Sequence, residues 1–228
     1  MKQFLKKVYL SFPQPRFTRF RNLKLFEWMN QHACGKRVLN LGSGEGTFDL
    51  NLSKEINTIR LDIDPSKPNL DVIADAHYLP FKTESLDIIY SIAVLEHVKK
   101  PWIVADEMAR VLCSGGHLVL ELPFLNIIHD KHDYFRFTDK GIRSLFDEKK
   151  FDVVFEQVSA GGGSFLSVFL LTYFRQFIPS KIGKKIWSFL LGYSFSLCKY
   201  LDVLINNSRE LRLTANSFTF IGKKRWLI

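Results

Sequence analysis

Cysteine is scarce in this sequence, with only three residues among 228. Cys34, Cys113 and Cys198 are far apart and show no Cys-x-x-Cys spacing. Small secreted domains depend on paired cysteines and many zinc sites on closely spaced ones, so neither class is indicated. We therefore expect a protein of the reducing cytosol, and no metal site is predicted.

A secretory signal is also lacking at the N-terminus. Met1 to Leu10 alternates lysine with apolar residues, but it has no long apolar segment and no cleavage site of small residues. Internal repeats and low-complexity tracts are absent from the sequence. These observations again predict a cytoplasmic location.

Acidic residues are few at both ends of the chain. The net charge is +9, and the basic excess lies in residues 1–37 and 161–228, whereas residues 38–160 have an acidic excess. This asymmetry indicates an anionic partner surface, either nucleic acid or lipid headgroups, with a solvated basic face as the alternative. With 46% hydrophobic residues, the chain can bury the core of one domain with additions.

A short apolar segment, Val38 to Leu41, leads directly into Gly42, Gly44 and Gly46. Glycine has no Cβ, so it adopts positive φ and lets the backbone approach a ligand closely. A helix that follows such a turn directs its N–H groups at the ligand. The segment therefore predicts a nucleotide-cofactor loop after the first strand.

Strands and helices are predicted to alternate along most of the chain. The expected strands are residues 37–41, 58–63, 71–75, 86–91, 117–122, 152–158 and 217–222, and the expected helices are residues 17–33, 46–55, 101–112 and 139–149. Pro101 begins the third helix and Gly115-Gly116 ends it, while only a loop or single turn fits between Asp62 and Asp75. This order predicts a Rossmann-like α/β fold, a doubly wound seven-stranded and mostly parallel sheet whose last strand is antiparallel.

The first expected helix carries apolar residues at three-residue spacing among basic ones, which is typical of an amphipathic helix. These residues are Phe17, Phe20, Leu23, Phe26 and Met29. We expect this helix to pack across the cofactor site or the edge of the sheet.

Five segments carry a more specific pattern when they are taken in order. They are Asn40-Leu41-Gly42-Ser43-Gly44-Glu45-Gly46, then Asp62, then Asp75-Ala76 with Leu79-Pro80-Phe81, then Val94-Leu95-Glu96-His97-Val98, and finally Arg110-Val111-Leu112 with Gly115-Gly116. Together they resemble the class I S-adenosylmethionine-dependent methyltransferases, in particular the branch called methyltransferase type 11. The resemblance covers residues 36–123.

The resemblance implies S-adenosylmethionine as the cofactor, with Asp62 at the ribose hydroxyls and Asp75 at the adenine amino group. Carboxylates suit both roles, because they can only accept hydrogen bonds when ionised. The implied cofactor-binding residues are Asn40, Gly42, Ser43, Gly44, Gly46, Asp62, Ile63, Asp75, Ala76 and Ser91.

A dinucleotide-dependent dehydrogenase is the competing interpretation of the glycine turn. Its Gly-x-Gly-x-x-Gly spacing differs from that of Gly42, Gly44 and Gly46, and it has no role for Asp75. The methyltransferase family usually has an acid at the first loop position, whereas this chain has the neutral Asn40. Weaker cofactor binding and loss of activity are therefore alternatives to full activity.

Methyl transfer is an in-line displacement that needs a positioned nucleophile and, for a hydroxyl acceptor, a base. His97 follows the fourth strand and is a candidate base, although it equally fits a residue that caps or packs the next helix. His129 and His132 follow the fifth strand, where a substrate should bind, and they are the other candidates.

The same loop carries the predicted substrate-binding residues Asp133, Tyr134 and Arg136. The loop resembles a His…Asp-Tyr-x-Arg-(Tyr/Phe)-Thr segment of methyltransferase-like proteins associated with bacterial surface polysaccharides. Arg136 could hold a phosphate or carboxylate with two hydrogen bonds. The structural alternative is that Asp133 pairs with Arg136 to shape the loop while Thr138 caps the following helix.

Residues 161–213 form an insertion before the last strand that is much longer than ordinary connections. It contains two mostly apolar helical segments, 165–174 and 186–205, with a basic break between them. Neither reaches the roughly 18 uncharged residues of a transmembrane helix. Apolar helices with a basic turn predict an interfacial membrane anchor, and a substrate lid or a homodimer interface is an equal alternative.

The sequence thus predicts a basic helical segment (1–36), a methyltransferase domain (37–160 and 214–228) and a hydrophobic helical insertion (161–213). The predicted activity is O-methylation of a small-molecule or lipid-linked saccharide, and a non-catalytic protein that binds cofactor or a partner is the alternative. Nucleic acid is disfavoured as a partner, because no basic stripe with exposed aromatics is separable from the apolar insertion. We expect a cytoplasmic protein, peripheral on the inner face of the membrane.

Overall fold

The computed structural model describes residues 23–46, 48–146, 150–198, 201–202 and 209–226. Most of the basic segment expected at residues 1–36 lies outside these ranges, including the first part of the helix predicted at 17–33. Parts of the apolar segment 186–205 also lie outside them.

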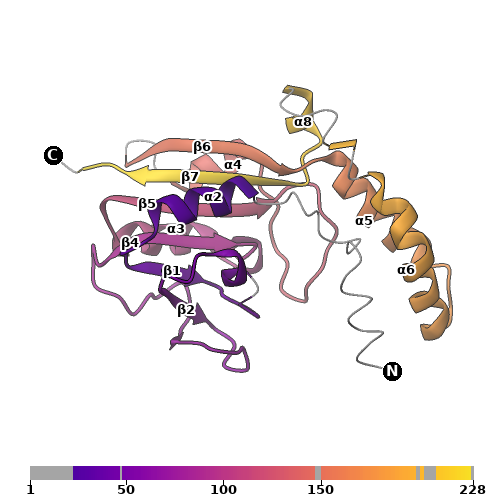
Figure 1. Cartoon of the computed structure of the whole chain (residues 1–228), viewed down its shortest axis with the longest axis horizontal. Coiled ribbons are helices and arrows are strands. Elements are labelled where there is room, and N and C mark those ends of the chain that lie inside the picture. The colour runs from indigo at the N-terminus through magenta and orange to yellow at the C-terminus, as the bar shows by residue number, and fades with distance from the viewer. Residues whose placement is uncertain (1–22, 47, 147–149, 199–200, 203–208, 227–228) are drawn as a thin grey trace. The chain divides into compact units, whose positions relative to one another are not determined.

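Seven strands form one sheet in the order β3-β2-β1-β4-β5-β7-β6 (Figure 1). Strands β3, β2, β1, β4 and β5 pair in parallel, and the last strands are antiparallel. The strands are β1 Val38–Leu41, β2 Thr58–Asp62, β3 Val72–Ile73, β4 Leu86–Ile92, β5 Leu112–Pro123, β6 Phe151–Ala160 and β7 Ser217–Lys224. The predicted Rossmann-like α/β fold is confirmed, including the connection from β2 to β3 without a helix.

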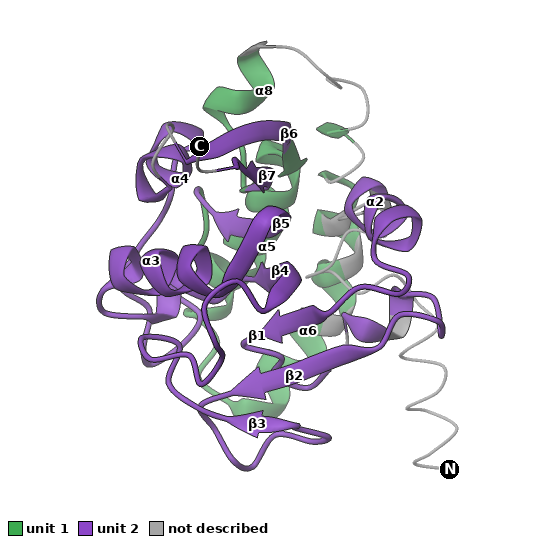
Figure 2. Ribbon diagram, turned by 90° about the vertical axis from the view of Figure 1, so that its left-hand side faces the viewer, with its two compact units in different colours: residues 1–21, 125–127, 158–217 green, residues 22–124, 128–157, 218–228 purple. Residues whose placement is uncertain are grey.

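Helices cover both faces of the sheet. The helix α2 (Leu23–His32) lies on one face, and α3 (Pro101–Val111) with α4 (Asp139–Leu145) lies on the other (Figures 1 and 2). Pro101 begins α3 as predicted, and the Thr138 hydroxyl accepts a hydrogen bond from the Gly141 N–H and caps α4. These local signals set where the helices start.

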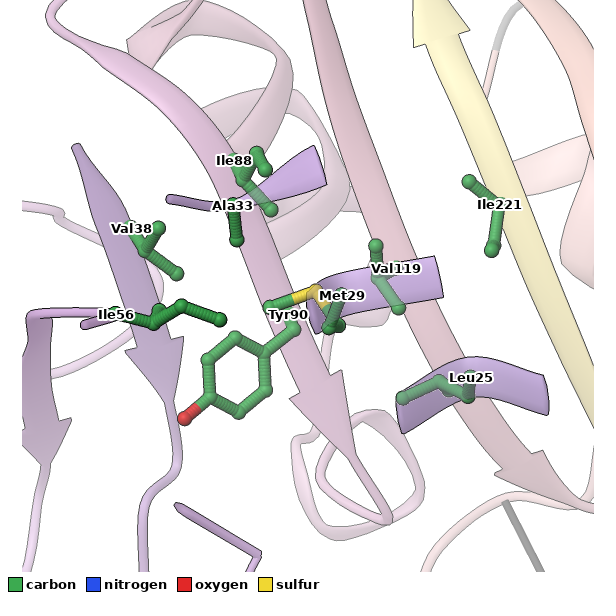
Figure 3. Packing of buried hydrophobic residues seen from close by; sticks show 9 residues of the cluster. All are labelled: Leu25, Met29, Ala33, Val38, Ile56, Ile88, Tyr90, Val119 and Ile221. Carbon is green, nitrogen blue, oxygen red and sulfur yellow. The ribbon is translucent and has the colours of Figure 1, made fainter. Parts of the chain in front are cut away.

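The helix α2 packs on the centre of its face of the sheet, not on an edge. Its apolar side chains lie against residues from β1, β4, β5 and β7, which alternate toward this face (Figure 3). The fully or nearly buried members of this cluster are Leu25, Met29, Ala33, Val38, Ile56, Ile88, Tyr90, Val119 and Ile221. Burying a large apolar side chain stabilises a fold by about 1.5–3 kcal/mol, so this cluster fixes the helix on the strands.

The prediction of a helix at residues 46–55 is wrong. A single 3₁₀ turn, η1 (Asp49–Asn51), stands in its place among the described residues. Leu52 is already extended, with ψ of 153°, and the Ser53 N–H donates to the Asn30 side chain, not to a helical carbonyl. Side-chain partners thus compete successfully with the helical hydrogen bonds of this short segment.

Gly115-Gly116 does not end the third predicted helix. The helix α3 ends at Val111 and both glycines lie inside β5, which begins at Leu112. A Cβ on Gly116 would lie 2.8 Å from the carbonyl oxygen of Asp87 on the neighbouring strand β4. The glycine is therefore required by the close approach of two strands, a constraint that the chain sequence alone does not reveal.

The chain divides into two compact units, shown in different colours in Figure 2. The sheet unit consists of residues 22–124, 128–157 and 218–228, and the helical unit consists of residues 1–21, 125–127 and 158–217. Within the helical unit, α5 (Gly162–Arg175) packs on α6 (Lys181–Ser196), and α8 (Arg209–Leu213) precedes β7.

The basic break predicted inside the insertion is wrong, because Lys181, Lys184 and Lys185 lie in the first turns of α6. Ser180 caps this helix by accepting a hydrogen bond from the Gly183 N–H. Among the described residues, no helix combines the length and the apolar character that crossing a membrane requires. The first helix of the insertion, α5, is held at its start by Asp202, whose carboxylate accepts hydrogen bonds from three backbone N–H groups.

Candidate functional site

The glycine turn lies at the carboxyl end of β1, as expected. Gly42, Gly44 and Gly46 all have positive φ, at 72°, 51° and 68°. The Gly42 and Ser43 N–H groups both donate to the carbonyl oxygen of Leu61 on β2, at 2.8 and 3.0 Å. The turn is therefore held on the neighbouring strand in a conformation that glycine adopts at little cost.

A close contact excludes any side chain at Gly42, the first glycine of the turn. A Cβ on Gly42 would lie 2.4 Å from a methyl carbon of Val94 in the loop after β4. A Cβ on Gly44 would have nothing within 4 Å. The turn is thus packed tightly at its first glycine and has open space at its second, which suits close approach of a ligand.

Two buried hydroxyl groups border this turn and have no hydrogen-bond partner in the part of the chain that the structure describes. They belong to Ser43 in the turn and Ser91 on β4. A buried hydroxyl without a partner costs about 1–3 kcal/mol, and a bound polar ligand would remove this cost. Both residues were assigned to the cofactor by the resemblance.

Asp62 ends β2, and its carboxylate closes the turn from the other side. One oxygen accepts the Gly44 N–H at 2.9 Å and the other accepts the Asp64 N–H at 3.0 Å. Each carboxylate oxygen has a second lone pair, so both can still accept a ligand hydroxyl. The next side chain, Ile63, is 65% exposed and offers apolar surface beside this carboxylate.

Asp75 follows β3 at the same edge of the sheet. Partial burial acts to raise its pKa, but hydrogen bonds from the backbone and ring of His77 prevail, and the pKa lies below its ordinary value. The carboxylate is therefore ionised at neutral pH and can accept a hydrogen bond from an amino group. Ala76 separates the two partners and adds no bulk.

Asn40 is buried and its amide is already engaged. It donates to Oδ1 of Asp49 at 3.1 Å, Arg60 donates to Oδ2 at 2.6 Å, and the Tyr90 hydroxyl also donates to this carboxylate. Burial, together with the hydrogen bond to Asp49, raises the pKa of Tyr90 above its ordinary value. The neutral residue at the head of the turn therefore has a carboxylate next to it.

Sequence reasoning missed Asp49, because it lay inside a segment expected to be helical. The signal available was an acid placed three residues after the last glycine of the turn. Its role depends on Arg60 and Tyr90, which come from two different strands and meet it only in the folded chain.

The histidines predicted after β4 and β5 lie together. His97 ends the 3₁₀ turn η2 (Leu95–His97), and its ring centroid is 4.9 Å from that of His129. The Nδ1 atom of His97 lies 2.5 Å from the carbonyl oxygen of His132. The rings of His97 and His129 therefore pack together within the sheet unit, and His132 joins this cluster through its backbone carbonyl.

Backbone hydrogen bonds hold the loop after β5 against η2. The Tyr134 and Phe135 N–H groups both donate to the carbonyl oxygen of Glu96, at 2.7 and 3.3 Å. The Tyr134 hydroxyl lies 3.1 Å from Nδ1 of His132, and the Tyr134 side chain is exposed. The loop thus presents His132 and Tyr134 at its surface.

Asp133 and Arg136 pair with each other. The sequence offered this pairing as the structural alternative to a role in substrate binding. The Arg136 guanidinium reaches both carboxylate oxygens of Asp133, whose side chain is only 1% exposed. This contact, with a hydrogen bond from the His129 N–H, lowers the pKa of Asp133 to about 2. The pair shapes the loop around the histidines.

Glu96 lies between Leu95 and His97 in the turn after β4, and the sequence predicted no role for it. Its side chain is fully buried, and burial raises its pKa to about 8. Its Oε1 atom lies 3.8 Å from Nε2 of His97. An acid directly before a histidine, shortly after a buried strand, was the signal that could have identified it.

Comparison with known proteins agrees with this geometry. Residues 39–120 match the family model described as "Methyltransferase domain". An "Uncharacterized methyltransferase" of Mycobacterium tuberculosis is 33% identical over 108 residues, which cover 41% of this chain and 42% of that protein. The chain therefore spans less than half the length of this curated relative.

Solved structures share the fold at low sequence identity. The YcgJ protein of Bacillus subtilis has a TM-score of 0.56 and 18% identity, covering 90% of this chain and 99% of that one. The [4+2]-cyclase SpnF has a TM-score of 0.58 and 14% identity, covering 89% and 80%. At these identities the likeness concerns the fold alone.

Proposed function

We propose that this chain transfers the methyl group of S-adenosylmethionine to an oxygen atom of a small-molecule or lipid-linked saccharide. Residues 39–120 form the class I S-adenosylmethionine-dependent methyltransferase domain of this proposal. S-adenosylmethionine is the cofactor that the family implies. When bound, it supplies an electrophilic methyl group on a sulfonium sulfur.

One observation carries the cofactor assignment: the turn, Asp62 and Asp75 follow three neighbouring parallel strands at the same edge of the sheet. Positive φ at Gly42 and Gly44 shapes the turn, while the carboxylates of Asp62 and Asp75 can accept hydrogen bonds from ribose and adenine. Ile63 would pack on the adenine ring. Asn40, Ser43, Gly46, Ala76 and Ser91 complete the proposed cofactor site.

The proposed reaction breaks the bond between sulfur and methyl and forms one between methyl and the acceptor oxygen. The sulfur keeps the electron pair, and the acceptor hydroxyl loses a proton. A base must take that proton, and the cluster of His97, His129 and His132 lies after β4 and β5, where the fold places substrates. We assign the base to this cluster.

A saccharide acceptor is supported by the chemistry of the loop after β5. Tyr134 and His132 lie at its surface and can both donate and accept hydrogen bonds, which suits hydroxyl-rich ligands. Arg136 is positively charged and its side chain is partly exposed, so it could attract an anionic group of the substrate. Asp133, Tyr134 and Arg136 therefore form the proposed substrate-binding set.

The test is to incubate the full chain with methyl-labelled S-adenosylmethionine and a cell extract. The extract is then separated into lipid, glycan and RNA fractions. Label in the lipid or glycan fraction, stable to mild base that hydrolyses methyl esters, is the expected result. Label confined to RNA would refute the saccharide acceptor, and no label in any fraction would contradict methyl transfer.

A second candidate is a protein that binds the cofactor without transferring its methyl group. The named cyclase among the similar structures shows that this fold also serves another reaction, so fold alone does not establish methyl transfer. The neutral Asn40 favours this candidate. Binding of S-adenosylhomocysteine without transfer to any fraction would support it.

We further propose that the helical unit attaches the protein to the inner face of the membrane. Large apolar side chains remain exposed along α5, α6 and their connection, among them Phe169, Tyr173, Phe177, Ile182, Ile186 and Leu190. The basic residues Lys181, Lys184 and Lys185 lie beside them on α6. Apolar side chains next to lysines suit the interface of an anionic bilayer.

Replacing Phe177, Ile182 and Leu190 together with serine should reduce co-sedimentation with phosphatidylglycerol vesicles by at least about tenfold, because each apolar side chain contributes roughly 1 kcal/mol or more when buried. These side chains are 70%, 73% and 61% exposed, so the fold should tolerate the change. Trp102→Ser is the matched control, since Trp102 is 51% exposed in the sheet unit. Unchanged sedimentation, with loss of dimer by analytical ultracentrifugation, would favour a homodimer interface.

A further inference from the structure

Three metal-ligating side chains converge beside the loop after β5. Glu96, His97 and His129 each offer one ligand atom, and these atoms all lie within 4.8 Å of one another. The three residues come from the turn η2 and from a loop more than thirty residues later, so folding alone brings them together. Two imidazoles and one carboxylate are a common donor set for divalent metals.

Glu96 supplies an independent reason to expect a ligand. Its side chain has no exposed surface, and neither carboxylate oxygen has a hydrogen-bond partner among the described residues. An ionised carboxylate without partners is very costly to bury. A bound cation would remove this cost and hold the carboxylate ionised.

The rings of both histidines are held by outer partners. The Nδ1 atom of His97 lies 2.5 Å from the carbonyl oxygen of His132, so a proton there leaves Nε2 as the lone-pair nitrogen. That Nε2 lies 3.8 Å from Oε1 of Glu96. The Nδ1 atom of His129 lies 3.3 Å from Asp133, which Arg136 in turn holds. Carbonyl and carboxylate partners of this kind orient metal-bound histidines.

We propose that Glu96, His97 and His129 bind one divalent transition-metal ion, of the zinc, manganese or iron(II) type. Two atoms bound to such an ion at about 2.1 Å lie at most about 4.2 Å apart, so the ligands need to close by only about 0.6 Å. Imidazole favours zinc and iron over magnesium and calcium, which prefer oxygen ligands. Cysteine spacing predicted no metal site, but this one uses histidine and glutamate.

Binding of the ion does not depend on the proposed function, whereas its role in the reaction rests on it. A bound divalent metal lowers the pKa of a coordinated hydroxyl, as it does for water. Two of the three candidate bases would then serve as ligands, and an acceptor hydroxyl on the metal would lose its proton more readily. His132 is outside the ligand set, and its exposed side chain in the same loop as His129 is the remaining candidate base for that proton.

The direct test is a titration of the full chain with Co²⁺, monitored by visible absorption. Any affinity tag is first removed, and bound metal is stripped with a chelator. Cobalt reports histidine ligation through its absorption bands and competes with zinc for the same donors. We expect one ion per chain and displacement by one equivalent of Zn²⁺. No stoichiometric binding of Co²⁺, Zn²⁺ or Mn²⁺ would overturn the proposal.

Two variants and a matched control locate the ion. Glu96→Gln and His129→Gln should each weaken Co²⁺ binding about 100-fold or more, since loss of an outer partner alone typically costs 10–100-fold. His132→Asn is the control, because it changes a histidine of the same cluster but keeps the carbonyl that orients His97. Equal affinity in Glu96→Gln and the unaltered protein would refute the ligand set.

Titration with S-adenosylhomocysteine separates folding failure from loss of the metal site, since neither variant lies in the proposed cofactor site. A variant that keeps this binding but loses Co²⁺ supports the proposal. If metal binds while methyl transfer is unaffected by a chelator, the catalytic role fails and the site stands. If transfer proceeds without any metal binding, the site fails and the proposed function stands.

Discussion

Replacing Asp62 with alanine is expected to weaken binding of S-adenosylhomocysteine about 100-fold, measured by calorimetry. The carboxylate is proposed to accept hydrogen bonds from both ribose hydroxyls, and a hydrogen bond to a charged group contributes about 1.5–3 kcal/mol. The same carboxylate accepts the Gly44 N–H at 2.9 Å, so its loss also loosens the glycine turn. Both consequences act in the same direction on cofactor affinity.

Two further variants separate these contributions. Asp62→Asn keeps one oxygen that can accept the Gly44 N–H, so we expect an intermediate affinity. Asp64→Ala is the control, because its exposed carboxylate lies two residues further along and its partners, Ser66 and Lys67, lie in its own loop. Equal affinity in Asp62→Ala and Asp64→Ala would mean that the cofactor binds elsewhere.

Replacing Gly42 with alanine is expected to destabilise the fold by about 3 kcal/mol, measured by urea unfolding followed through tryptophan fluorescence. A left-handed backbone, with φ of 72°, costs an ordinary residue about 1–2 kcal/mol. The added Cβ would also lie 2.4 Å from a methyl carbon of Val94, and overpacking of this kind costs about 1–3 kcal/mol. The two costs have separate origins and should add.

Gly35→Ala isolates the backbone cost, because Gly35 has φ of 70° but nothing within 4 Å of an added Cβ. We expect a loss of only about 1 kcal/mol there. The double variant Gly42→Ala with Val94→Ala should recover part of the packing cost. If Gly42→Ala and Gly35→Ala lose the same stability, the contact with Val94 has no energetic importance.

Local patterns predicted most of the sheet unit. The continuous apolar segment at 86–91 became the buried strand β4, Pro101 began α3, and Thr138 capped α4. These features depend on neighbours within a few residues, so the sequence contains them in full. The predicted helix at 46–55 failed because Asp49 and Ser53 find partners on distant elements, which no local pattern contains.

The residues of the candidate cofactor site could be predicted from the sequence because they lie at the ends of strands. The glycine turn follows one predicted parallel strand, and Asp62 and Asp75 lie at the ends of two others, so their common edge followed from topology. Pairings between side chains did not follow from topology. Whether Arg136 faced a substrate or Asp133 was left open by the sequence, and the structure shows that it pairs with the buried Asp133.

The sequence by itself determined the order of the strands, the glycine turn and the acids at the strand ends, because each depends on backbone preference and periodicity. Only the tertiary structure placed Asp49 beside Asn40 and packed Glu96, His97 and His129 within reach of one ion. Burial and long-range contact decide the charge and partners of such groups. Those quantities belong to the folded chain, since the environment that shifts the pKa of Glu96 is made by residues far away in sequence.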